Sequence, residues 1–134
     1  MSGYVLDTNA WIALMKSRVE VVEKVRQAGV ESLYLCAPVW SELWFGACNS
    51  QRVAENQQAI RALAAGIPSL PFDDLAAEHC GEIRALLARQ GRPIGPYDLQ
   101  IAAIARAAKL RLVTRNVSEF SRVPGLTIEN WQTA

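Results

Sequence analysis

The sequence contains only one histidine, His79, in 134 residues, and this scarcity excludes several kinds of active site. Acid–base catalysis shared between two histidines is impossible, and a lone histidine in a helical pattern is more often structural. No glycine-rich loop follows an apolar run, so hydrolysis of a nucleoside triphosphate on such a loop has no support. No serine stands in a Gly-x-Ser-x-Gly turn, which removes the usual hydrolase nucleophile.

The chain also lacks long hydrophobic runs, close cysteine pairs and a strong net charge. No apolar stretch is long enough to cross a bilayer, and no basic segment followed by an apolar one opens the chain, so we expect a cytoplasmic protein without membrane contact. Cys36, Cys48 and Cys80 each lie among apolar residues, which favours reduced, buried thiols. A net charge of +1 gives no indication of nucleic-acid binding. It does not exclude such binding, because the acidic residues could lie together at one site with the basic residues around it.

Hydrophobic residues make up 51% of the sequence, which is enough for one sizeable core. Short apolar runs without polar alternation are typical of strands buried on both faces, and here they alternate with longer helical patterns. This alternation predicts an α/β fold in one domain over residues 1–134, a three-layer α/β/α sandwich with a mostly parallel sheet. We expect strands at 4–6, 33–37, 69–72, 110–114 and 126–128, and helices at 9–16, 19–28, 38–48, 51–65, 74–90, 96–109 and 116–120.

Several local expectations follow from the residue pattern. Asn9 is a reasonable N-cap for the first helix. Val19, Val22 and Val25 have the spacing of one helix face, which we expect to be buried. Arg106 is expected to be solvated, as most arginines are.

The helix that Pro38 opens is apolar nearly all round, and such a helix needs cover on more than one side. The core can supply one side, and the other suggests a surface for a partner. Trp40 and Trp44 share a face of this helix, where core packing competes with an interface. Gly46 costs about 1 kcal/mol relative to alanine inside a helix, and we attribute its presence to close backbone packing.

Three acidic residues stand near the junctions between expected strands and helices. Asp7 directly follows the first strand, although a carboxylate there also suits a helix cap in an Asp-Thr-Asn turn. Asp98 lies in the first turn of a helix, where complementing the helix dipole explains it equally well. Glu42 lies one turn into a helix among apolar neighbours such as Leu43, so it needs a cation or a hydrogen-bond network.

Together the three acids suggest a metal site. The junctions reach one edge of a parallel sheet, so we expect Asp7, Glu42 and Asp98 to converge within coordination reach of one cation. Crowded carboxylates raise one another's pKa unless a positive charge lies between them. Oxygen ligands without histidine or cysteine favour Mg²⁺ or Mn²⁺ over zinc. All three are candidate catalytic residues that together would hold the ion, which polarises a phosphate and lowers the pKa of a bound water.

Four sequence motifs follow one another along nearly the whole chain: LDTNAWI, VWSELWFG, GPYDLQIAAIA and LVTRNVSEF. In residues, order and spacing they resemble the motifs of PIN-domain proteins and, more narrowly, of the VapC toxins of bacterial toxin–antitoxin pairs. The closing segment RVPGLTIENW resembles the enterobacterial-type branch of the family, some of whose members cut the anticodon loop of initiator tRNA.

The resemblance implies a PIN α/β/α sandwich and a metal-dependent endoribonuclease, the toxin of a type II toxin–antitoxin system. It implies that Asp7 and Asp98 chiefly hold Mg²⁺ or Mn²⁺, that Glu42 completes the acidic cluster, and that Asn9 and Thr114 are supporting polar groups. It further implies an RNA substrate, a homodimer and a higher assembly with a small VapB-type antitoxin. That antitoxin would lie over apolar helices and direct a basic side chain towards the acids.

One position departs from the family pattern. Many PIN domains carry a fourth aspartate after the strand expected at 110–114, where this chain has Asn116 and, three residues later, Glu119. Asn116 supplies no charge, and Glu119 could replace the missing acid or be a solvated helix residue. The departure puts a second bound metal in doubt.

Three other functions compete with the ribonuclease hypothesis. A structure-specific DNA nuclease of the larger PIN kind needs arch and helical elements for which 134 residues leave no room. A phosphoacceptor receiver domain needs a lysine at the site, and Lys16, Lys24 and Lys109 are not at a suitable strand end. A catalytically silent PIN-like binding module is slightly favoured by Asn116.

Overall fold

The computed structural model describes residues 3–132, which contain a five-stranded sheet in which all neighbouring strands are parallel. The strand order is β3-β2-β1-β4-β5. The mostly parallel sheet is confirmed, and each strand overlaps the run predicted for it. The strands are β1 (Tyr4–Leu6), β2 (Leu33–Cys36), β3 (Ser69–Leu70), β4 (Arg111–Val113) and β5 (Ile128–Glu129).

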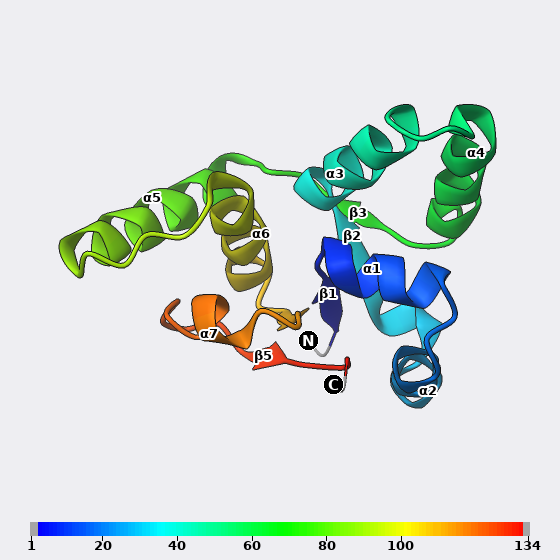
Figure 1. Cartoon of the computed structure of the whole chain (residues 1–134). Coiled ribbons are helices and arrows are strands. Elements are labelled where there is room, and N and C mark those ends of the chain that lie inside the picture. The colour runs from blue at the N-terminus through cyan, green and yellow to red at the C-terminus, as the bar shows by residue number, and fades with distance from the viewer. Residues whose placement is uncertain (1–2, 133–134) are drawn as a thin grey trace.

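Seven α-helices and one short 3-10 helix connect the strands in this part of the chain. They are α1 (Thr8–Met15), α2 (Val19–Ala28), η1 (Val30–Ser32), α3 (Ala37–Cys48), α4 (Val53–Ala64), α5 (Asp74–Arg89), α6 (Pro96–Ala107) and α7 (Val117–Phe120). Connections between parallel strands are right-handed. A connection that steps towards one edge of the sheet therefore crosses one face, and a connection that steps towards the other edge crosses the opposite face. In Figure 1, α1 to α4 lie to the right of β1 and above it, and α5 to α7 lie to its left, which confirms the three-layer sandwich.

Strand β1 is the buried centre of the sheet, with Val5 and Leu6 fully inaccessible. It pairs with β2 through Tyr4 and Leu33, and with β4 through Leu6 and Val113. The chain leaves β1 in the direction of β2 and β3 and then returns to β4 on the other side. The strand order therefore reverses between β1 and β4, and ligands of open α/β sheets bind at the carboxyl ends of strands at such a point.

Two side-chain placements differ from the sequence predictions. In α2, Val21 and Val25 are buried, whereas Val19 is 73% exposed, because residues four apart share a helix face and Val19 lies off that stripe. The prediction of buried thiols holds for Cys36 and is wrong for Cys48, which is exposed at the end of α3. No helix among residues 3–132 is both long and apolar enough to cross a membrane.

Gly46, in α3, lacks the close packing predicted for it. A Cβ built at this position meets no atom within 4 Å, and the residue is exposed. Packing within the chain therefore does not explain this glycine.

We expect Gly46→Ala to raise the free energy of unfolding of the isolated chain by about 1 kcal/mol, because alanine loses less backbone entropy in a helix. Urea denaturation of the purified chain measures the change. Gly125→Ala is the opposing control, because its φ of 78° strains any side chain and should lower stability. A Gly46→Ala variant less stable than the parent would contradict the open space seen around this residue.

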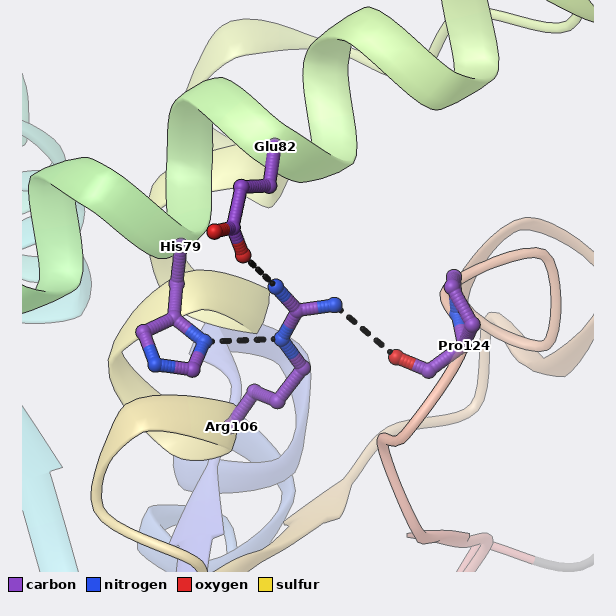
Figure 2. A network of polar contacts seen from close by, with 4 residues as sticks. All are labelled: His79, Glu82, Arg106 and Pro124. Carbon is purple, nitrogen blue, oxygen red and sulfur yellow. Dashed lines mark hydrogen bonds and ion pairs between the residues drawn. The ribbon is translucent and has the colours of Figure 1, made fainter.

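Arg106, on α6, is not solvated as predicted, since its side chain is only 16% exposed. Its Nε donates to His79 Nδ1 at 2.8 Å, and its Nη2 donates to Glu82 Oε1 at 2.9 Å, both on α5. Its Nη1 donates to the carbonyl oxygen of Pro124 at 3.1 Å. Figure 2 shows the guanidinium between α5 on one side and the segment after α7 on the other. One side chain thus joins two helices and the segment that leads to β5, and His79 has a structural partner.

Candidate active site

Asp7 directly follows β1 at the carboxyl edge of the sheet. Its backbone N–H donates to Val113 O at 3.0 Å, which holds the residue between β1 and β4 where the strand order reverses. Its Oδ1 accepts a hydrogen bond from Ala10 N–H at 2.9 Å and so caps α1. This confirms the alternative prediction that Asp7 caps a helix, whereas the prediction of Asn9 as the cap is wrong, because the helix already begins at Thr8. Capping uses one carboxylate oxygen and leaves the other for a second partner.

The Asp7 carboxyl group is poorly solvated, with only 7% of the residue exposed. Burial raises its pKa, and the charge of Glu42 raises it further. Hydrogen bonds from Thr114 and Ala10 lower it, as does the charge of Arg115, but burial dominates. A buried carboxylate in this position would gain from a nearby cation.

Asp98 lies in the first turn of α6 and is half-buried. Burial, together with the charges of Glu119, Glu42 and Asp7, raises the pKa of its carboxyl group to about 6. Like charges shift a pKa only when they lie near the group. Asp98 therefore lies within electrostatic reach of the other three acids, which come from the end of β1 and from α3 and α7.

Glu42 has a hydrogen-bond partner that the sequence analysis missed. The hydroxyl group of Thr8, in the first turn of α1, donates to Glu42 Oε1 at 3.0 Å. This bond joins α1 to α3 beside Asp7 and meets part of the requirement for a polar network around Glu42. The sequence did contain one sign of this partner, because Thr8 places a hydroxyl group directly beside Asp7 in the Asp-Thr-Asn turn.

The end of β4 supplies further polar groups. Thr114 is completely buried, its Oγ1 accepts a hydrogen bond from Asn116 N–H at 2.9 Å, and its hydrogen bond to Asp7 lowers the pKa of that carboxyl group. Asn116 thus contributes its backbone to the local structure. The acid whose charge acts on Asp98 from this region is Glu119, in α7.

The donor set consists of carboxylate and hydroxyl oxygens, which suit Mg²⁺ or Mn²⁺. Among residues 3–132, however, no three His, Cys, Asp or Glu side chains lie together as a ready metal-binding group. Charge acts over longer distances than coordination, so the acids can influence one another's pKa without forming a closed ligand set. The residues fit an ion held by one or two carboxylates with water in the remaining positions, as Mg²⁺ is usually held.

Asp7, Glu42 and Glu119 thus act electrostatically on Asp98, but among residues 3–132 no three of these acids form a preformed ligand set. Asn9 is exposed and lines a polar cleft beside this region. The assignment of Asp7, Glu42 and Asp98 as catalytic residues, and of Asp7 and Asp98 as metal ligands, stays a prediction.

Comparison with known proteins gives long, continuous matches. The PIN domain family matches residues 4–126. The chain is 40% identical over 131 residues to the tRNA(fMet)-specific endonuclease VapC of Shigella flexneri, covering 98% of this chain and 99% of that protein. It is 36% identical over 132 residues to the ribonuclease VapC2 of Haemophilus influenzae, again covering 98% and 99%.

Solved structures show the same fold over the same length. VapBC2 from Rickettsia felis, bound to a DNA fragment from its promoter, matches with a TM-score of 0.91 and 29% identity, covering 98% of this chain and 100% of the other. DNA-bound VapBC from Salmonella typhimurium matches with a TM-score of 0.91 and 35% identity, with the same coverage.

Proposed function

The chain belongs to the PIN-domain family and to its VapC ribonucleases, and from this premise we propose that it is a toxin endoribonuclease that hydrolyses a phosphodiester bond in a structured RNA. The observation that carries the proposal is the gathering of acids where the strand order reverses. Asp98 is under the influence of Asp7, Glu42 and Glu119, and this excess of negative charge suits a bound cation.

In the proposed reaction, Asp7 and Asp98 would hold a divalent cation, Mg²⁺ or Mn²⁺. When bound, the cation polarises the phosphate and offsets the charge that develops during hydrolysis. Glu42 is oriented by Thr8, which engages one of its carboxylate oxygens. Its other oxygen is available to accept a proton from the attacking water. The Thr114 hydroxyl group lowers the pKa of Asp7 and so favours its charged form, and the charge of Glu119 raises the pKa of Asp98.

We propose initiator tRNA, cut in its anticodon loop, as the substrate. Two relatives, from Shigella flexneri and Salmonella typhimurium, are tRNA(fMet)-specific endonucleases and align over 98% of this chain at 40% and 36% identity. RNA recognition depends on unpaired loops and on shape, which such relatives can share.

The experiment incubates the purified chain and Mg²⁺ or Mn²⁺ with transcripts of initiator tRNA and elongator methionine tRNA and with single- and double-stranded DNA. We expect cleavage of the initiator tRNA alone, with the cut mapped to the anticodon loop by sequencing the 5′ ends. Cleavage of branched DNA in preference to RNA would support the DNA nuclease alternative. Tight Mn²⁺ binding with no turnover of any RNA would support the silent binding module.

We further propose that a VapB-type antitoxin docks in an apolar groove of about 1030 Å³ along α3 and α4. Phe45 is 69% exposed there, and the guanidinium of Arg61 lies 5.1 Å from the centroid of the Trp44 ring. Exposed aromatic surface of this kind marks protein interfaces. We also propose a homodimer that forms a higher assembly with the antitoxin. The groove is lined by Ala37, Trp40, Ser41, Trp44, Phe45, Cys48, Arg61 and Ser69.

We expect Phe45→Ala to weaken binding of the co-purified antitoxin about thirtyfold, which corresponds to about 2 kcal/mol for an aromatic anchor. RNA cleavage by the free toxin should not change. Val19→Ala, which truncates another exposed apolar residue outside the groove, is the matched control. Titration calorimetry measures binding, and light scattering reports the subunit number. A variant that loses its own dimer while still binding the antitoxin would show that the groove is instead the dimer seam.

A further inference from the structure

A second cleft, of about 370 Å³ and mostly polar, lies along α1 and the turn into α2; we call it the basic cleft. Its cations are Lys16, Arg18 and Arg115, and Glu20 is its acid. None of the four ion pairs found among residues 3–132 involves any of these three cations. The cleft therefore presents positive charge that is not neutralised by pairing.

The basic cleft begins beside the candidate active site. Arg115 lies two residues beyond the end of β4, where Val113 O accepts the hydrogen bond from Asp7 N–H. Lys16 is the C-cap of α1, the helix that Asp7 caps at its other end. Helix α1 has 8 residues and so extends for about 12 Å. The cleft thus follows one helix away from the acids.

The turn that carries Lys16 and Arg18 has a defined geometry. Arg18 N–H donates to Ala13 O and Ser17 N–H donates to Leu14 O, both at 3.0 Å, which is the Schellman arrangement. Ser17 has a φ of 56°, in the left-handed region where glycine is the usual residue. The two cations that flank Ser17 are therefore attached to a hydrogen-bonded backbone. RNA supplies what these cations lack, because it carries a phosphate charge on every nucleotide.

We propose that the basic cleft binds the backbone of the RNA next to the scissile phosphate and so holds the substrate across the acids. This inference rests on the proposed ribonuclease function. Lys16 and Arg18 contact phosphates, which position the RNA without reading its sequence. An acidic segment of the antitoxin is the competing ligand. RNA is favoured because the cleft is polar and adjoins the acids, whereas the groove on α3 and α4 is apolar and suits a protein.

The test compares Lys16→Ala/Arg18→Ala with Lys24→Ala/Arg89→Ala, which removes one lysine and one arginine that are likewise exposed but lie outside the cleft. Both pairs are made in an Asp98→Asn background, so that the RNA stays intact. Binding of fluorescein-labelled initiator tRNA is measured by anisotropy over a range of salt concentrations. We expect the cleft pair to weaken binding at least tenfold. The slope of log K against log salt should become shallower by about 1.4, at about 0.7 for each phosphate contact.

The control pair should leave affinity and slope within error of the parent. Equal effects from the two pairs would overturn the inference, and so would a cleft pair that binds RNA normally but loses the antitoxin. In the cleavage-competent chain, the cleft pair should raise KM and leave kcat largely unchanged, because the acids are intact. A chain that cleaves no RNA would contradict the proposed function, whereas the anisotropy experiment would still decide whether the cleft binds RNA.

Discussion

Replacing Asp98 with asparagine should lower RNA cleavage in Mg²⁺ or Mn²⁺ at least about a hundredfold. The amide keeps the shape of the side chain but removes a charge that would hold the cation. Loss of groups that only support metal ligands already costs ten- to a hundredfold, so loss of a ligand should cost at least as much. Asp7→Asn should have a similar effect while leaving α1 capped, because asparagine is as good an N-cap as aspartate. Initial rates on labelled RNA measure both changes.

Asp73→Asn is the matched control for Asp7→Asn. Asp73 caps α5 in the same way, since its Oδ1 accepts a hydrogen bond from Ala76 N–H at 2.9 Å, but its charge does not act on Asp98. This variant should cleave RNA at the parent rate. Full activity of the parent chain in EDTA would contradict the metal-dependent mechanism, and full activity of Asp98→Asn would remove Asp98 from it.

The same Asp98→Asn substitution should stabilise the metal-free protein at neutral pH. The pKa of Asp98 is raised to about 6 from 3.8, so the folded state holds its proton more tightly than the unfolded state. The stabilising contribution is complete below about pH 4 and is lost as pH rises through 6. The variant should therefore melt at a higher temperature than the parent at pH 7, and the difference should shrink towards pH 4. A parent chain more stable than the variant at pH 7 without metal would contradict the crowding of acids around Asp98.

Replacing Arg106 with alanine should lower the free energy of unfolding by about 2 kcal/mol, because its mostly buried side chain loses its packing and the partly buried His79 Nδ1 loses its donor. For a domain of this size the change corresponds to a fall in Tm of about 8 °C. The bond to Glu82 should contribute little, because the Glu82 side chain is 71% exposed. Urea and thermal denaturation measure the loss.

Glu82→Ala is the control that separates these contributions, and it should change stability by no more than about 0.5 kcal/mol. If Glu82→Ala and Arg106→Ala have equal effects, the ion pair and not the buried part of the network stabilises α5 against α6. Hydrogen exchange should show faster opening of the segment around Pro124 in Arg106→Ala alone.

Most of the fold was predictable because strand and helix patterns are local. The apolar run from Tyr4 to Leu6 ends at Asp7, and Pro96 opens the helix of Asp98, as the structure has them. The errors concern environment. Gly46 has open space around it, and Arg106 is mostly enclosed, although their neighbours in the sequence gave no sign of either.

The sequence by itself determined the α/β class, the order of elements and the placement of acids after strands, because hydrophobic periodicity and caps depend only on neighbouring residues. Only the tertiary structure decided which polar groups meet. Thr8 contacts Glu42, 34 positions away, and Glu119, in α7, acts on Asp98, in α6. The basic cleft likewise joins the end of α1 to the end of β4. These contacts between distant residues depend on strand order and on the rotation of each helix about its axis. Neither can be predicted from the pattern of neighbouring residues.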